Sequence, residues 1–191
     1  MKFLDQAKIY IRSGNGGAAG VDWDQAKNVG KALLSQLADV LPGLKSRSGV
    51  DLRLRAIASS RRMALEDTAM DPASAAARLR ADDAQACDLD AFAAHVRAGH
   101  LPHAMIVDCS ASDAVAAKYA DWLAAGIHVV TPNKHAGSGD WARYTAITEA
   151  RREGSSRFLY EATVGAGLPV VLTLRNLIDT GDTLHAIDGM L

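Results

Sequence analysis

Three segments of the chain combine polar or glycine-rich residues in a way that suits ligand binding. They are "CSAS" (109–112), "TPNKHAG" (131–137) and "EATVGAGLP" (161–169), and each stands between a predicted strand and a predicted helix. In an open parallel sheet, ligands bind beyond the carboxyl ends of the strands. Helix N-termini at that edge offer unpaired N–H groups and a partial positive charge, which suit a phosphate or a carboxylate. We therefore expect the three segments to meet at one edge of a sheet and bind an anionic small molecule.

Lys134 and Ser110 are the candidate binding side chains of the first two segments. Lys134 follows an apolar strand, a proline and an asparagine, so its ammonium would point into the crevice at the strand ends. The alternative is a solvated lysine, which is the commoner fate of this residue type. The Ser110 hydroxyl would either contact a ligand or, like that of Ser112, cap the helix predicted to begin near Asp113.

Glu161 places a carboxylate in a largely apolar segment, "FLYEATV". The glycines of "VGAGLP" let backbone carbonyls turn toward a common point, and carbonyl oxygens with one carboxylate suit a hard cation. The alternatives are a carboxylate in water at the end of the sheet and glycines that serve only as turn residues.

The second predicted strand ends in "IASSRR" (57–62), with two hydroxyl and two guanidinium groups. A dinucleotide-binding sheet that prefers NAD often has an acidic residue there, which holds a ribose hydroxyl. Ser60 and Arg61 instead favour a 2′-phosphate, which indicates NADP rather than NAD. The alternative is a basic turn exposed to solvent.

Alternating strands and helices must position these residues. Short apolar strands separated by helices predict βαβ units and a parallel sheet covered on both faces, which is an α/β fold. Residues 61–104 are alanine-rich and give a weaker, helical pattern with a turn at Asp71-Pro72, and the first helix should stop at Pro42-Gly43. The predicted strands are 7–12, 50–60, 105–112, 127–134, 157–165 and 183–191, and the later helices are 113–126, 140–154 and 168–179.

Composition argues against several classes of function. The 21 basic and 22 acidic residues nearly cancel, so neither nucleic acid nor an anionic membrane is the expected partner. Cys87 and Cys109 form no CxxC pair, and the histidines lack metal-ligand spacing, so we expect a reduced, cytoplasmic chain without a zinc site. No segment has the apolar length of a signal peptide or a membrane span.

The segments "VDCSASDAVAAKYADWLAAGIHVVTPNKHAGS" and "RFLYEATVGAGLPVVLTLRNLIDTGD" resemble homoserine dehydrogenase, in particular the form fused behind aspartokinase. The resemblance extends from Asn28 to Leu191. It implies a Rossmann-like doubly wound parallel sheet and the reduction of aspartate semialdehyde to homoserine. The implied cofactor is NADP, with NAD as the alternative.

The resemblance implies cofactor contacts at named positions. Ser110 and Ala111 would contact the cofactor, and Lys134 would do so near the reacting end, as the catalytic residue. Val29 and Gly30 match the end of the family's GxGxVG motif, with Gly30 at the start of the first helix as a close-packing glycine.

The resemblance also implies a cation site. Glu161 and the backbone carbonyls of Val164, Ala166 and Leu168 would hold a monovalent cation, which we expect to be sodium.

The start of the chain departs from the family. "VDWDQAK" stands where the family has a strand and the first glycines of its motif. The upstream "KIYIR" could supply the first strand, and Gly14, Gly16 and Ala19 fit G-x-G-x-x-A. Because Asp22 and Asp24 would repel a pyrophosphate that they faced, we expect an impaired phosphate grip.

The sequence stops at "HAIDGML", where the family's substrate and dimerisation domain begins. We therefore divide it into an N-terminal segment (1–27), an NAD(P)-binding domain (28–180) and the start of a second domain (181–191). We expect little turnover from this chain alone. The family forms homo-oligomers, and whether an aspartokinase belongs upstream is left open.

Residues 1–20, "MKFLDQAKIYIRSGNGGAAG", resemble instead the opening of Obg-family GTPases, a glycine-rich domain separate from the nucleotide site. No GTPase motif follows in the sequence. Two further functions stay open: a non-catalytic nucleotide-binding fragment, and an Obg-like interaction module that docks on a ribosome-like partner.

Overall fold

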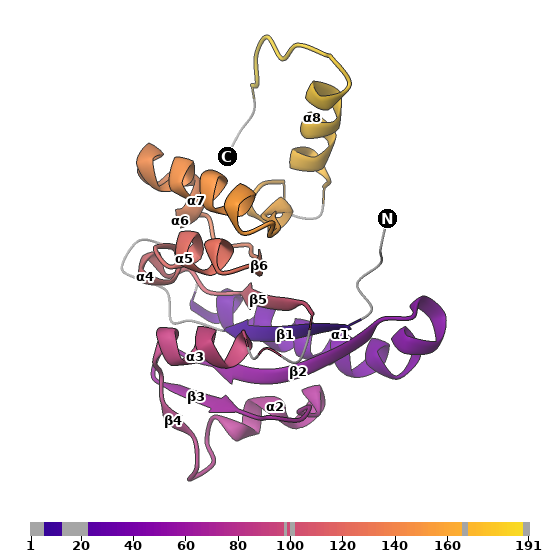
Figure 1. Ribbon diagram of the computed structural model, residues 1–191, viewed down its shortest axis with the longest axis vertical. Coiled ribbons are helices and arrows are strands. Elements are labelled where there is room, and N and C mark those ends of the chain that lie inside the picture. Colours follow the sequence, from indigo (N-terminus) through magenta and orange to yellow (C-terminus); the bar gives the residue numbers. More distant parts are fainter. Residues whose placement is uncertain (1–5, 13–22, 98, 100–101, 166–167, 189–191) are drawn as a thin grey trace.

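The computed structural model describes residues 6–12, 23–97, 99, 102–165 and 168–188 (Figure 1). Its strands form one sheet in the order β4-β3-β2-β1-β5-β6-β7. The predicted α/β fold with a parallel sheet is confirmed. Two short strands extend this sheet at one side, because β3 (Arg62–Leu65) pairs antiparallel with β2 and with β4 (Gln85–Ala86). The strands joined by parallel pairing are β1 (Gln6–Arg12), β2 (Asp51–Ala58), β5 (Ala104–Asp108), β6 (Ile127–Val130) and β7 (Phe158–Leu159).

Helices cover both faces of the sheet. One buried apolar cluster joins α1 and α2 to one face, and another joins α3, α4, α5, α6 and α7 to the opposite face. α8 stands apart from the sheet in Figure 1, and none of its side chains is buried. The helices are α1 (Trp23–Ser48), α2 (Pro72–Arg78), α3 (Leu89–Val96), α4 (Asp113–Ala116), α5 (Tyr119–Ala124), α6 (His135–Ser138), α7 (Trp141–Glu153), the 3₁₀ helix η1 (Glu161–Thr163) and α8 (Val170–Asp179).

β1 lies at the centre of the sheet, between β2 and β5. It contains the residues "KIYIR" that are predicted as the first strand. Ile9 pairs with Leu54 of β2 and with Met105 of β5. Because β1 and β5 leave the sheet in the same direction, their carboxyl ends lie side by side, at the position where open α/β sheets bind ligands.

α1 begins earlier and ends later than predicted. It starts at Trp23, so Gly30 lies inside the helix and its predicted place at the helix start is wrong. It also continues through Pro42, because one missing N–H does not outweigh the burial of Leu37 and its neighbours on the sheet. The helix ends at Ser48, and the following Gly49 has a φ of 67°, which glycine adopts without steric cost.

β2 contains an irregularity at Arg55. The residues on both sides of Arg55 pair with β1, but Arg55 does not, which is the arrangement of a bulge. As a result Leu54 and Ile57 both face α1. The Arg55 side chain is buried, and it donates to the carbonyl of Glu66 at 3.0 Å and to the carboxylate of Asp67 at 3.2 Å.

Four other elements differ from the sequence predictions. β3 lies in the weakly patterned segment 61–104, and the helix predicted at 113–126 is divided into α4 and α5. The strand predicted at 157–165 is reduced to β7, because the chain turns into η1 at Glu161. Residues 183–188 form neither a helix nor a strand, so the strand predicted there is wrong.

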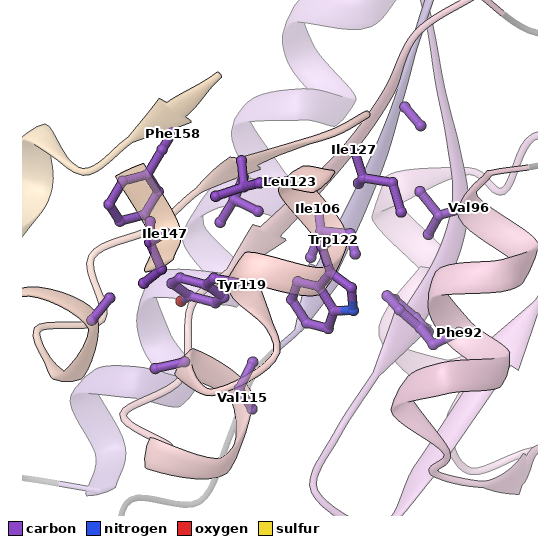
Figure 2. Close-up of a cluster of buried hydrophobic side chains, with 14 of the residues drawn as sticks. Phe92, Val96, Ile106, Val115, Tyr119, Trp122, Leu123, Ile127, Ile147 and Phe158 are labelled. Atoms are coloured by element: carbon purple, nitrogen blue, oxygen red, sulfur yellow. The ribbon is translucent and has the colours of Figure 1, made fainter. Parts of the chain in front are cut away.

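The larger apolar cluster fixes α5 against the sheet (Figure 2). Tyr119, Trp122 and Leu123 of α5 are buried with Ile106 of β5, and Phe92 of α3 lies beside the Trp122 indole. Each large apolar side chain that is fully buried contributes about 1.5–3 kcal/mol to stability. This packing holds the Tyr119 ring over the end of β5.

Candidate functional site

Two of the predicted binding segments are joined directly by hydrogen bonds. The side-chain amide nitrogen of Asn133 donates to the carbonyl of Ser112 and to the carboxylate of Asp108, each at 3.0 Å. The amide oxygen of Asn133 accepts the backbone N–H of His135 at 3.1 Å. The segments 109–112 and 131–135 therefore lie together at the carboxyl edge of β5 and β6. The third segment begins with η1 at the same edge, because β7 is parallel to β6.

Asp108 is the centre of a buried polar network at this edge. Its carboxylate accepts the N–H of Ser110 at 2.8 Å and the hydroxyl of Tyr119 at 2.5 Å, in addition to the Asn133 amide. The hydroxyl of Thr131 donates to the backbone carbonyl of Asp108 at 2.8 Å. Burial, with the Asp108 charge as a further cause, raises the pKa of Tyr119. Tyr119 is therefore a donor to Asp108 at neutral pH.

Lys134 presents a free positive charge at the edge. Its side chain is exposed and makes no ion pair or hydrogen bond with any residue in the described part of the chain. Its backbone carbonyl, in contrast, accepts the N–H groups of Gly137 at 3.0 Å and Ser138 at 2.9 Å. The backbone is thus anchored while the ammonium stays available for an anionic ligand.

Ser110 lies against the network rather than at the helix start. It is buried, and its hydroxyl oxygen accepts the N–H of Ser112 at 3.3 Å. Ser112 occupies the N-cap position of α4 but makes no side-chain cap hydrogen bond, so neither serine caps the helix through its hydroxyl. Ala111 between them is half-buried. Cys109, which directly precedes Ser110, has a thiol pKa that burial and the Asp108 charge raise to about 12, which keeps it un-ionised.

The basic residues after β2 have different roles. Arg62 donates to the carbonyls of Ala81 at 3.0 Å and Ala84 at 2.7 Å, so its guanidinium is used within the fold. Ser60 and Arg61 are exposed, and their side chains have no hydrogen-bond partner among the described residues. Arg61 is therefore the guanidinium of this pair that is available to a ligand.

Val29 and Gly30 lie away from the start of α1. Val29 is 44% exposed, and Gly30 is buried. Gly30 stands seven residues after Trp23, which corresponds to about 10 Å of helix. Their contact with a cofactor stays a prediction. The alternative glycine motif at Gly14, Gly16 and Ala19 falls outside the described residues.

Glu161 contacts the start of α8. Its carboxylate oxygens accept the N–H groups of Val171 at 3.0 Å and Leu172 at 2.8 Å. Of its predicted partners in a cation site, Val164 and Leu168 are exposed, and Ala166 lies outside the described residues. In the described ranges, no group of three or more His, Cys, Asp or Glu residues could hold a metal ion.

An ion pair fixes the outer side of the edge. The guanidinium of Arg143 on α7 donates to the carboxylate of Asp113 on α4 at 2.5 and 3.2 Å. This hydrogen bonding holds the pKa of Asp113 below its usual value and raises that of Arg143. The pair braces α4 against α7 next to the segment that carries Lys134.

Sequence reasoning missed the buried network of Asp108, Tyr119, Thr131 and Asn133. One signal was present, since Asp108 is an ionisable residue that ends the apolar strand "MIVD". A carboxylate at such a position is costly to bury unless hydrogen-bond donors surround it. Its donors come from 2, 11 and 25 residues away, and the pattern of the sequence does not identify them.

Comparisons with known proteins identify the family of the chain. A family model described as "Homoserine dehydrogenase, NAD binding domain" matches residues 28–161. The chloroplastic bifunctional aspartokinase/homoserine dehydrogenase 1 of Zea mays is 43% identical over 163 residues, which are 85% of this chain and 18% of that protein. The bifunctional aspartokinase/homoserine dehydrogenase 2 of Escherichia coli (strain K12) is 36% identical over 163 residues, which are 85% of this chain and 20% of that protein.

Solved structures share the fold. A Candida auris protein of unknown function aligns with a TM-score of 0.73 at 28% identity, over 92% of this chain and 44% of that one. A hyperthermophilic archaeal homoserine dehydrogenase in complex with NADPH aligns with a TM-score of 0.67 at 23% identity, over 91% of this chain and 50% of that one. The Rossmann-like character of the sheet is thus confirmed.

The family match covers only part of the relatives and only part of this chain. The chain spans 18–20% of the length of these curated relatives, and the resemblance of residues 1–20 to Obg-family GTPases stays a prediction because the family model begins at residue 28. Among the helices of the described chain, none combines the length and the apolarity that a membrane crossing requires.

Because the family model covers most of the sequence, this chain belongs to the homoserine dehydrogenase family and carries its NAD-binding domain.

Proposed function

We propose that this chain binds NADPH at the carboxyl edge of its sheet, as the nucleotide-binding part of a homoserine dehydrogenase. The complete enzyme would reduce aspartate semialdehyde to homoserine. The observation that carries the proposal is the exposed ammonium of Lys134, which has no partner among the described residues and stands on a segment hydrogen-bonded to the 109–112 loop. An exposed lysine at the carboxyl edge of an open α/β sheet suits a phosphorylated dinucleotide and an acidic aldehyde substrate alike.

Each available group has a proposed part in binding. Ser110 and Ala111 line the cofactor at the end of β5, and Lys134 orients the nicotinamide and the aldehyde. Ser60 and Arg61 bind the 2′-phosphate, which favours NADP over NAD, because both side chains are exposed without partners among the described residues. When bound, the reduced nicotinamide supplies the hydride for the carbonyl carbon.

A monovalent cation, sodium, is proposed at Glu161 with the carbonyls of Val164, Ala166 and Leu168. Each carboxylate oxygen of Glu161 accepts one backbone N–H, which leaves lone pairs for a cation. The family resemblance supplies the remaining support for this site. The cation and the helix start would share one carboxylate.

The proposed partners are small molecules. With 21 basic and 22 acidic residues, the chain has no excess of positive charge to attract nucleic acid. The cytoplasm stays the predicted compartment, whereas the Zea mays relative is named as chloroplastic.

A titration of NADPH that follows its fluorescence tests the proposal. We expect saturable binding to this chain, and a dissociation constant about tenfold higher in Lys134→Ala, since a charge-assisted hydrogen bond is worth about 1.5–3 kcal/mol. Lys45→Ala is the control for loss of an exposed lysine, because Lys45 lies in the last turn of α1 and its 3.6 Å ion pair is with Asp51 at the start of β2, away from the carboxyl edge. Absence of binding, or equal affinity in the two variants, would contradict the proposal.

A further inference from the structure

The Asp108 carboxylate connects three segments that the sequence separates. It accepts hydrogen bonds from Ser110 in the loop after β5, from Tyr119 at the start of α5 and from Asn133 in the loop after β6. Asp108 and Tyr119 are 0% exposed, and Asn133 is 2% exposed. A buried carboxylate of this kind is tolerated only while its donors stay in place. The hydrogen bonds to Asp108 are therefore expected to form and break together.

Thr131 closes the network on the β6 side. Its hydroxyl oxygen lies 2.9 Å from that of Tyr119 and accepts the backbone N–H of Asn133 at 2.8 Å. Asn133 thus has both its backbone N–H and its side-chain amide engaged. Because Asn133 directly precedes Lys134, this fixes the point from which the lysine side chain extends.

We propose that Asp108 is a positioning residue for the cofactor: through Asn133 and Ser110 it holds Lys134 and the 109–112 loop in the one relative placement that both need to contact the same ligand. This inference rests on the proposed function, because it assigns a cofactor to the edge. Asp108 itself has no role in contacting the ligand, since it lies beneath the loops and is fully buried.

Two variants that disrupt the hydrogen-bond network to different extents test the proposal. Asp108→Asn keeps the shape but places an amide N–H₂ against the donors, and Tyr119→Phe removes a single hydroxyl from the network. We expect the dissociation constant for NADPH to rise about tenfold in Asp108→Asn and about threefold in Tyr119→Phe, as expected for one or two lost buried hydrogen bonds. In a Lys134→Ala background the effect of either substitution should be smaller, because only the contacts of the 109–112 loop are then left to misplace and coupled residues are not additive.

Ser156→Ala is the matched control. Ser156 is buried, and its hydroxyl donates to the carbonyl of Leu123 at 2.8 Å. Because Ser156 comes just before β7, it lies at the amino ends of the strands, opposite to the carboxyl edge that carries the loops. The substitution Ser156→Ala therefore removes one buried hydroxyl, as Tyr119→Phe does, without changing either loop. We expect its affinity for NADPH to match that of the unsubstituted chain.

Amide hydrogen exchange without cofactor gives a second readout. In Tyr119→Phe, which keeps the ring in the core, the loops 109–112 and 131–135 should both exchange faster, whereas Ser156→Ala should leave them unchanged. Faster exchange in only one loop, or an affinity loss of undiminished size in the Lys134→Ala background, overturns the inference. If the unsubstituted chain bound no NADPH, the proposed function would fail, and the exchange data would still decide whether Asp108 couples the loops.

Discussion

The backbone N–H of Leu172 donates a 2.8 Å hydrogen bond to the carboxylate of Glu161, eleven residues earlier in the chain. The other carboxylate oxygen accepts the N–H of Val171 at 3.0 Å. Two N–H groups that a helix start leaves unpaired are therefore satisfied, and the negative charge lies at the favourable end of the helix dipole. Glu161 thus joins the end of β7 to the start of α8.

Replacing Glu161 by alanine should loosen the first turn of α8. We expect amide exchange at residues 170–173 to rise about fivefold, since loss of a helix cap costs about 1 kcal/mol. Glu161→Gln retains one acceptor and should have a smaller effect. Glu149→Ala, which removes an exposed carboxylate from α7, is the control for lost charge. Unchanged exchange in Glu161→Ala would show that the carboxylate does not cap α8.

The strands around the site can be predicted because each is a short apolar run that ends at a polar residue. The continuation of α1 through Pro42 cannot be predicted in this way. It depends on the burial of Leu37 against the sheet, and the local sequence around Pro42 does not reveal that packing. The same holds for the bulge at Arg55, which follows from pairing with β1. Lys134 is recognisable from its place after a strand, whereas the network beneath it depends on three segments meeting in space.

Gly154 should be intolerant of any side chain. A Cβ built there would lie 1.8 Å from the backbone carbonyl oxygen of Leu123, at the crossing of the ends of α5 and α7. Since backbone must move to relieve this overlap, Gly154→Ala should lower the free energy of unfolding by about 1–3 kcal/mol in urea. Gly137→Ala, where a Cβ meets nothing within 4 Å, should be neutral or slightly stabilising. Equal stability of the two variants would be inconsistent with the close contact.

His128 should make the chain less stable as the pH falls. Burial lowers the pKa of His128 below its ordinary 6.5, with the neighbouring His103 and Arg157 as lesser causes. The unfolded chain therefore takes up the proton first, so the His128 contribution is complete above pH 6.5 and is lost as the pH decreases below it. The ring also accepts the Arg157 N–H at 3.0 Å through Nδ1.

Urea unfolding at pH 7.5 and 5.5 measures this effect. In His128→Asn the side-chain oxygen can accept the same N–H but does not titrate in this range. The variant should therefore lose less stability between the two pH values than the unsubstituted chain. The same loss in both proteins would assign the pH dependence to other groups.

Arg61 and Arg62 should separate cofactor selectivity from stability, although they are neighbours in the sequence. Arg62 binds the carbonyls of Ala81 and Ala84, so Arg62→Ala should lower the free energy of unfolding by about 1–3 kcal/mol. Arg61 is exposed and lacks a side-chain partner in the described ranges, so Arg61→Ala should leave stability unchanged. If its guanidinium binds the 2′-phosphate, the substitution should weaken NADPH binding about tenfold and NADH binding hardly at all. Parallel titrations with the two nucleotides decide the matter, because a general loss of structure weakens both, whereas loss of a phosphate contact changes only their ratio.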